Sequence, residues 1–192
     1  LHDKVKWVSE IDNGQSDAIN KGISLSTGNW IAWQNCDDLY YDDQVLNNFN
    51  KFINFNPSKK LFVGNIILTN EKLEKVRDLK FVKPSFYSLL YEEMTLTNQS
   101  AFWHKSLHQN LGFLKNMRIN FDYEWFLRIL KNYPDCGSHI NKTFGIYRIH
   151  QLQKTKILNL NDIESKKKIK KDYGFKKNID FLMKIILKLR RL

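Results

Sequence analysis

Residues 30–38 have the sequence Trp-Ile-Ala-Trp-Gln-Asn-Cys-Asp-Asp, and this stretch decides the fold. Its apolar start and polar end predict a short buried strand. Two adjacent carboxylates, Asp37 and Asp38, follow that strand at once. Because ligands of open α/β sheets collect beyond the carboxyl ends of the strands, these acids are placed to meet a substrate or a cation. Paired carboxylates favour a hard cation such as Mg²⁺ or Mn²⁺. The alternative is that they cap the N-terminus of a following helix.

The composition indicates a chain with a substantial core. A length of 192 residues with 42% hydrophobic residues predicts one domain plus an appendage. Cys36 and Cys136 lie far apart and match no metal-binding spacing, so we expect free thiols in a reducing compartment. The sequence contains no signal peptide and no apolar run long enough to cross a bilayer, and we therefore expect a cytoplasmic protein.

The net charge of +11 is concentrated at the C-terminal end. Residues 151–192 contain 13 lysines or arginines and 4 acidic residues, a net charge of +9, which leaves +2 for residues 1–150. This distribution argues against a nucleic-acid groove within the globular part, and we expect no nucleic-acid partner. It favours a separate contact between the tail and something anionic.

The N-terminal pattern predicts a strand, a helix and a second strand. Residues 5–8 have strand character, Ser16 precedes an amphipathic stretch at 17–25, and the apolar run at 30–33 follows. A crossover of this kind joins parallel strands in a layered α/β fold.

The later pattern continues to alternate helices and strands. Residues 71–80 fit either a helix or one strand of a hairpin, and residues 97–103 form an extended segment. We expect helices from 45 to Pro57, at 84–91, 106–111 and 121–130, and strands at 61–68 and 144–150.

Two further residues are candidates for chemistry. Asp122 lies in the first turn of the predicted 121–130 helix, where the free backbone N–H groups would keep it ionised as a base. It could instead be an N-cap. His150 ends the predicted 144–150 strand and could bind a metal, although an isolated histidine is more commonly a surface or satisfied core residue.

Several motifs occur in a fixed order along the chain: residues 7–10, 12–22, 26–28, 35–38, 99–103, 122–128, 147–150 and the pair Lys154-Thr155. Taken in order, these segments resemble the central block of bacterial family 2 glycosyltransferases of the GT-A fold. The resemblance covers about residues 5–155, and we interpret 1–155 as a partial GT-A domain and 156–192 as a basic amphipathic tail. It implies an α/β, Rossmann-like three-layer sandwich with a mixed, mainly parallel sheet.

The resemblance implies a nucleotide-sugar donor, a saccharide or lipid-linked acceptor and a role in cell-envelope polysaccharide synthesis. By position, Asp38 would bind a divalent cation (Mg²⁺ or Mn²⁺) on the donor diphosphate, with Asp37 close to the ribose or the metal. Asp122 would be the base that deprotonates the acceptor hydroxyl, which gives inversion at the anomeric carbon. His150 would approach the metal or the diphosphate.

Other residues of the resemblance have weaker assignments. Asp12, Gln15 and Asp17 could contact the donor, or they could only form a turn and a helix cap. Gln99 and Trp103 could line the acceptor side, because aromatic faces stack on sugar rings, but core packing explains Trp103 equally well.

The family begins with a strand and a helix that carry the first nucleotide contacts, and this chain does not contain them. We therefore expect an N-terminally truncated domain. If the chain in the cell also begins at Leu1, the donor pocket lacks one wall, and a catalytically inactive carbohydrate-binding remnant becomes the first rival function.

The tail combines a basic run at 166–171 with a predicted amphipathic helix at 175–192. Such a helix suits an anionic membrane surface, at the inner face of the cytoplasmic membrane, or it docks on the domain with its lysines in solvent. A basic membrane-surface or nucleic-acid adaptor is the second rival function. One stripe of the helix is polar and the opposite one apolar: Lys177, Asp180, Lys184, Lys188 and Arg191 against Ile179, Leu182, Met183, Ile186 and Leu189.

Overall fold

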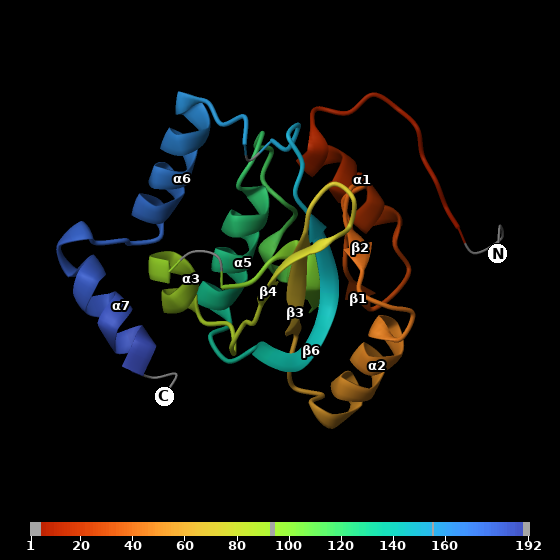
Figure 1. Ribbon diagram of the computed structural model, residues 1–192, viewed down its shortest axis with the longest axis horizontal. Helices are drawn as coiled ribbons and strands as arrows, with labels where there is room; N and C mark the ends of the chain where they lie inside the picture. The colour runs from red at the N-terminus through yellow and green to blue at the C-terminus, as the bar shows by residue number, and fades with distance from the viewer. Residues whose placement is uncertain (1–4, 93–94, 155, 190–192) are drawn as a thin grey trace.

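The computed structural model describes residues 5–92, 95–154 and 156–189 and shows helices around a curved sheet (Figure 1). Leu1, Thr155 and Arg191, named above, lie outside these ranges. In chain order the elements are α1 (Gln15–Leu25), β1 (Trp30–Ile31), β2 (Leu39–Tyr40), α2 (Val45–Phe55), β3 (Leu61–Thr69), β4 (Lys75–Leu79), α3 (Phe86–Glu92), η2 (Asn98–Ser100), β5 (Ala101–His104), α4 (Ser106–Leu111), α5 (Phe121–Asn132), β6 (Gly137–Arg148), α6 (Leu160–Asp172), η3 (Lys177–Ile179) and α7 (Asp180–Leu189).

The sheet is mixed, with the strand order β1-β5-β3-β6-β2 and β4 beside β3. Within the described ranges only β3 and β6 pair in parallel, and the other neighbouring strands are antiparallel. The mixed sheet of an α/β fold, expected from the sequence, is confirmed, with β3 and β6 as its central parallel pair. The strand expected at residues 5–8 was wrong, because these residues form no strand and β1 pairs with β5.

The sheet lies between two helical layers. Side chains alternate along its strands, so the sheet has two apolar faces and helices cover each of them. In β3, Leu61 and Val63 join the core beneath α5, whereas Phe62 joins a second core beneath α2. Trp125 of α5 and Phe49 of α2 belong to these two cores respectively. The three-layer α/β architecture expected from the sequence is confirmed.

Local patterns predicted most elements correctly. Helix α2 begins at Val45 and ends two residues before Pro57, and α4 covers the expected residues 106–111. The ambiguous segment 71–80 contains β4, which forms a hairpin with β3. Strand β6 begins earlier than expected, at Gly137, and ends two residues before His150.

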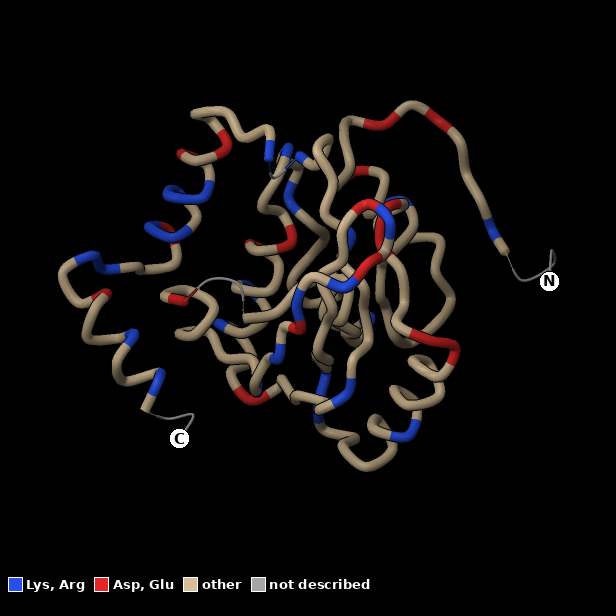
Figure 2. Tube along the Cα trace, viewed as in Figure 1, with Lys and Arg blue, Asp and Glu red and all other residues tan. Residues whose placement is uncertain are grey.

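The C-terminal segment packs on the domain as two helices. The basic run is part of α6, and a separate α7 follows the short helix η3. Ile169 and Leu187 are each only 6% exposed and join the core beneath α5. Figure 2 shows lysines on both helices. Among the described residues, no helix has both the length and the apolar character that crossing a membrane requires.

A buried carboxylate connects α5 to the segment after α6. Glu124 is 1% exposed and accepts hydrogen bonds from Arg128 (2.8 Å) and from the Tyr173 hydroxyl (2.7 Å). Lys115 forms an ion pair with it at 2.9 Å. Burial, and then the hydrogen bond to Glu124, raise the pKa of Tyr173. These contacts hold α6 against α5, on the side of the domain where Asp122 lies.

Gly145 provides a test of this packing. A Cβ added there would lie 2.5 Å from the backbone oxygen of Gln99. We expect Gly145→Ala to lower the free energy of unfolding by about 1–3 kcal/mol, because neither backbone can move without disturbing the sheet. Urea denaturation measures the change. Gly22→Ala is the matched control: Gly22 lies within α1, an added Cβ has no atom within 4 Å, and stability should rise by up to about 1 kcal/mol. Equal stabilities of the two variants would contradict the packing described.

Candidate active site

Several of the residues singled out from the sequence line one cavity. This cavity, which we call the polar cavity, has a volume of about 480 Å³. Asp37, Asp122 and His150 line it together with Gln15 and Gln99. These residues come from five separate parts of the chain, so only folding brings them together.

Asp37 and His150 form a pair at one end of the sheet. The Oδ2 atom of Asp37 lies 2.8 Å from Nε2 of His150, and both side chains are about three-quarters buried. Antiparallel pairing of β2 with β6 brings the residues before β2 beside those after β6. His150 is therefore neither a free surface histidine nor a core histidine, and it faces the polar cavity.

Asp38 is buried behind this pair. It is 5% exposed and is not among the residues that line the polar cavity. Its Oδ2 accepts hydrogen bonds from Gln99 Nε2 (2.7 Å) and Asn35 Nδ2 (2.8 Å), and its Oδ1 accepts one from the backbone N–H of Arg148 (3.2 Å). Burial raises the pKa of Asp38, although these hydrogen bonds oppose that change.

The helix-cap alternative for the two acids was wrong. The next helix, α2, begins at Val45, and its N-cap residue is Gln44. Of the two carboxylates, Asp37 faces the polar cavity, whereas Asp38 accepts hydrogen bonds from three neighbouring segments.

Asp122 is the second residue of α5 and faces the same cavity. The N-cap is Asn120, in the left-handed conformation (φ 64°) that asparagine tolerates, so Asp122 is not itself the cap. Burial raises the pKa of Asp122, while the Tyr123 N–H (2.8 Å) and the charge of Lys166 oppose this effect. Desolvation therefore outweighs the hydrogen bond and the neighbouring charge in setting the direction of this pKa change.

The loop before α1 and the first turn of α1 bring only one of three candidate residues to the polar cavity. Gln15 lines it and donates to Asn35 Oδ1 at 3.0 Å. Asp12 accepts from the Gly14 N–H (2.8 Å), and Asp17 accepts from the Asn13 N–H (2.9 Å). The structure does not bring Asp12 or Asp17 to this cavity, and their contacts match the alternative of a turn at Asn13-Gly14. The cap alternative was wrong, because the N-cap of α1 is Gly14, without a side-chain cap hydrogen bond.

The two candidates for the acceptor side separate in the structure. Gln99 lines the polar cavity, whereas Trp103 is completely buried and donates from Nε1 to His108 Nε2 at 2.8 Å. Trp103 points into the core beneath α5 because side chains alternate along β5. Its assignment to a sugar-binding surface was wrong, and the core-packing alternative holds.

Some lining residues were not identified from the sequence. Asn98 carries a buried Nδ2, and Gln99 a buried Oε1, that have no hydrogen-bond partner within the described part of the chain. Buried polar atoms are normally satisfied, so this pair indicates a place for a polar ligand. Lys154 and Tyr147 were quoted only within motifs, and Arg118 carried no local signal; all three line the polar cavity.

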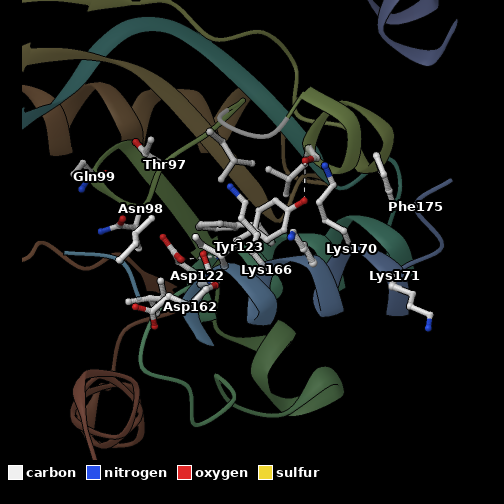
Figure 3. Close-up of a pocket in the computed structure, with 18 of the residues that line it drawn as sticks. Thr97, Asn98, Gln99, Asp122, Tyr123, Asp162, Lys166, Lys170, Lys171 and Phe175 are labelled. Carbon is white, nitrogen blue, oxygen red and sulfur yellow. Dashed lines mark hydrogen bonds between the residues drawn. The ribbon is translucent and has the colours of Figure 1, made fainter. Parts of the chain in front are cut away.

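A second cavity adjoins the first. We call it the lysine cavity; it has a volume of about 690 Å³ and lies between α5, α3 and α6 (Figure 3). Asp122 lines both cavities, as do Asn98, Gln99 and Tyr147. A carboxylate shared by two adjoining cavities can accept a proton from a molecule in one while a second molecule occupies the other.

The protein alone offers few ligands for a cation. Within the described ranges, no three His, Cys, Asp or Glu side chains come close enough to hold a metal ion together. Asp37 and His150 are an oxygen and a nitrogen donor facing the polar cavity. Mg²⁺ commonly uses one or two carboxylates together with substrate phosphates and water, so this pair fits a cation that arrives with a phosphorylated ligand.

Comparison with known proteins identifies similar sequences. A family model for glycosyl transferase family 2 matches residues 2–121. A PGL/p-HBAD biosynthesis glycosyltransferase of Mycobacterium tuberculosis (strain ATCC 25618 / H37Rv) is 26% identical over 126 residues, which are 64% of this chain and 46% of that protein. A protein of the same description from Mycobacterium bovis (strain BCG / Pasteur 1173P2) gives the same values. The chain spans about half the length of these curated relatives.

Solved structures share the fold. The crystal structure of S. aureus TarS 1–349 in complex with UDP-GlcNAc has a TM-score of 0.65 and 12% identity, covering 94% of this chain and 53% of that one. The complex of the same protein with UDP has a TM-score of 0.59 and 12% identity, covering 89% and 49%. At this identity the likeness establishes the architecture alone.

The pKa of Asp122 leads to a pH-dependent prediction about stability. Because folding raises this pKa above 3.8, the protonated carboxyl favours the folded state below pH 3.8, and that contribution is lost as the pH rises through the folded-state pKa. Asparagine cannot ionise. We expect Asp122→Asn to gain stability relative to the wild type over that pH range, as measured by urea denaturation at a series of pH values.

Asp17→Asn is the control, because its effect on stability should depend on pH in the opposite direction. The backbone hydrogen bond from Asn13 lowers the pKa of Asp17, so its contribution is present above pH 3.8 and is lost as the pH falls through the folded-state pKa. Asp17→Asn should therefore be less stable than the wild type at neutral pH, with the difference shrinking in acid. A stability difference for Asp122→Asn that does not change with pH would refute the buried placement of this carboxylate.

Proposed function

This chain belongs to glycosyl transferase family 2, and we propose that it transfers a sugar from a nucleotide-sugar donor to a saccharide or lipid-linked acceptor. The observation that carries the proposal is the convergence of Asp37, His150 and Asp122 on one cavity. We extend the proposal to inversion at the anomeric carbon, to dependence on a divalent cation and to a role in cell-envelope polysaccharide synthesis.

Asp122 is the proposed base. Its carboxylate removes the proton of an acceptor hydroxyl as that oxygen attacks the anomeric carbon of the donor. The bond from the anomeric carbon to the diphosphate breaks, and the nucleoside diphosphate leaves with the electron pair. Attack from the side opposite the leaving group inverts the configuration. The shared position of Asp122 between the polar and lysine cavities supports this role, because acceptor and donor can approach it from different sides.

Asp37 and His150 are the proposed residues on the diphosphate side. A divalent cation bound there would offset the negative charge that develops on the leaving diphosphate. The 2.8 Å contact between the two side chains and their position on the cavity wall support Asp37, rather than Asp38, as the cation ligand. Lys154, whose Nζ donates to Gln15 at 3.1 Å, adds positive charge to the same wall.

We also propose contact with an anionic membrane surface through α7. Phe181, Leu182 and Leu189 are 78%, 55% and 63% exposed, and Lys184 and Lys188 lie on the same helix. Exposed apolar side chains beside lysines suit the boundary between lipid head groups and acyl chains. Such a contact would bring the domain close to a lipid-linked acceptor.

The rival functions differ from this proposal in their chemistry. An inactive carbohydrate-binding remnant would bind sugars without turning over a nucleotide sugar. A basic adaptor would use the C-terminal helices alone, and its binding would not depend on Asp122 or Asp37. Turnover of a panel of nucleotide sugars, beginning with UDP-sugars, separates these possibilities.

Asp122→Asn tests the proposed base. We expect the rate of transfer to fall by about 10²–10⁴-fold, because the acceptor hydroxyl loses its proton acceptor, while donor affinity stays nearly unchanged. Release of nucleoside diphosphate in the presence of acceptor, together with calorimetric donor binding, measures both quantities. Asp135→Asn, at a side chain that is 92% exposed, should keep full activity. Unchanged turnover in Asp122→Asn would exclude this carboxylate as the base.

Asp37→Asn and Asp38→Asn together test the metal assignment. In the wild type, donor affinity should be higher in the presence of Mn²⁺ than in the presence of a chelator. Asp37→Asn should abolish most of this difference, because a carboxylate ligand of the cation is lost. Asp38→Asn should instead lower the free energy of unfolding by about 1–3 kcal/mol, because an amide cannot accept all three hydrogen bonds. Calorimetry and urea denaturation provide the two measurements. Loss of metal dependence only in Asp38→Asn would restore Asp38 as the cation ligand.

A further inference from the structure

We propose that Asn120 and Asp162 are positioning residues that hold the proposed base, Asp122, where the polar and lysine cavities meet. The inference rests on the proposed function, because it concerns the base of that reaction. Two contacts carry it, which we together call the α6 clamp. Arg118 forms an ion pair with the Asp162 carboxylate, and Asn120 donates from Nδ2 to the Asp162 backbone oxygen at 3.2 Å. Asp122 and Asp162 both line the lysine cavity and lie on the same side of it in Figure 3.

Asn120 does not act as an ordinary helix cap. Asparagine is a favoured N-cap residue, because its side-chain oxygen accepts a hydrogen bond from an N–H group of the first turn. Asn120 is the N-cap of α5, but within the described chain its side chain makes no such bond. Its amide instead donates to α6. The N-terminus of α5 is therefore tied to another element, and its position depends on α6.

The segment that leads into α5 is held from two sides. On one side, Asn20 of α1 exchanges two hydrogen bonds with the backbone of Leu114, at 2.9 and 3.0 Å. On the other side, the α6 clamp holds Arg118 and Asn120. Asp122 is the second residue after Asn120. The clamp thus acts on the part of the segment that lies next to the base.

Asp162 is a rigid anchor for these contacts. It is 4% exposed and is the third residue of α6. It also takes part in a capping box, because Asn159 accepts a hydrogen bond from its backbone N–H (2.9 Å) and its carboxylate accepts one from the Asn159 N–H (3.1 Å). Such reciprocal bonds fix the first turn of a helix. The residue that holds Arg118 and Asn120 is therefore itself held in place.

The clamp concerns the position of Asp122 rather than the folding of α5. Phe121 and Trp125 are buried in the core and keep the helix in place. The N–H groups of a first turn lack partners within the helix, so this turn is the part most easily displaced. Asp122 accepts a hydrogen bond from the Tyr123 N–H in that turn (2.8 Å) and moves with it. A displacement of about 1 Å at a reacting group can lower a rate about 10²-fold.

Asn120→Gly tests the clamp while preserving the backbone. Glycine adopts the left-handed conformation of Asn120 (φ 64°) without strain, but it cannot donate to Asp162. We expect kcat to fall about tenfold or more, with the KM of the donor nearly unchanged, because the base is displaced and the diphosphate side is not. The assay is the release of UDP from UDP-sugars, with water as the acceptor. An unchanged kcat would overturn the proposal.

The pKa of Asp122, measured without substrate, separates positioning from the loss of a substrate contact. Burial raises this pKa, so a loosened first turn that admits water should lower it towards 3.8. Asn120→Gly leaves the charges of Arg118, Asp162 and Lys166 unchanged. Carbon NMR titration of labelled aspartate carboxyls measures the pKa, and Asp122→Asn identifies the signal. A lowered kcat with an unchanged pKa would show a direct substrate contact and overturn the proposal.

Asn56→Gly is the matched control. Asn56 flanks α2, and its Nδ2 donates to the backbone oxygen of Phe52 at 3.1 Å, which is the same kind of contact that Asn120 makes. It lines neither the polar nor the lysine cavity. We expect Asn56→Gly to leave both kcat and the pKa of Asp122 unchanged. Equal changes in Asn56→Gly and Asn120→Gly would show a general loss of stability and overturn the assignment.

Asp162→Asn removes the other half of the clamp. The amide keeps one oxygen for the Asn159 N–H but loses the charge that faces Arg118. We expect kcat to fall severalfold, again with little change in KM. Because both contacts act through one anchor, the double variant of Asn120→Gly with Asp162→Asn should lose less than the product of the separate losses. Losses that multiply would show independent roles and overturn the shared clamp.

Two outcomes separate this inference from the proposed function. Turnover of a UDP-sugar by the wild type, with full kcat in Asn120→Gly, would overturn the inference and leave the function intact. A lowered pKa of Asp122 in Asn120→Gly, without turnover of any nucleotide sugar by the wild type, would support the placement of the carboxylate by the clamp and refute the function.

Discussion

The hydrogen bonds to the buried carboxylate of Asp38 are the interaction on which the rest of the site depends. They join the turn after β1 (Asn35), the helix η2 (Gln99) and the end of β6 (Arg148). A buried carboxylate is stable only when donors surround it, so these three segments must stay together. Their association leaves the neighbouring Asp37 facing the polar cavity, where it meets His150. One acid thus organises the backbone, and the adjacent acid is available for chemistry.

Asp122 connects this organisation to the other side of the domain. It comes from α5, whose apolar face is anchored by Trp125 and Phe126 in the core. The helix therefore presents its first turn to both cavities, and burial raises the pKa of the carboxylate there. A base with a raised pKa holds an abstracted proton more strongly, at a cost in stability. Burial of Asp122 therefore has two effects. It makes the ionised carboxylate less favourable in the folded protein, and it makes that carboxylate a stronger proton acceptor in the proposed mechanism.

The basic C-terminal segment takes part in the same arrangement. Glu124 binds the Tyr173 hydroxyl, and Asp162 pairs with Arg118, so contacts at both ends hold α6 beside α5. Part of the net charge that the sequence assigns to a separate tail is therefore close to the candidate site. Four of its lysines line a cavity that includes Asp122, whereas α7 carries its exposed apolar residues elsewhere on the surface. The proposed membrane contact therefore involves α7 and not α6.

The sequence by itself determined most of the local elements and indicated several residues of the candidate site. Periodicity predicted α4, α5 and β3, and the ordered motifs identified Asp37, Asp122, His150 and Gln99, because both signals depend on residues close together in the chain. Only the tertiary structure decided that β1 pairs antiparallel with β5, that Trp103 is core and that Asp37 rather than Asp38 faces the cavity. It also decided that the lysines of α6 lie beside Asp122. Strand partners, side-chain direction and desolvation depend on contacts between distant segments, and no local pattern encodes them.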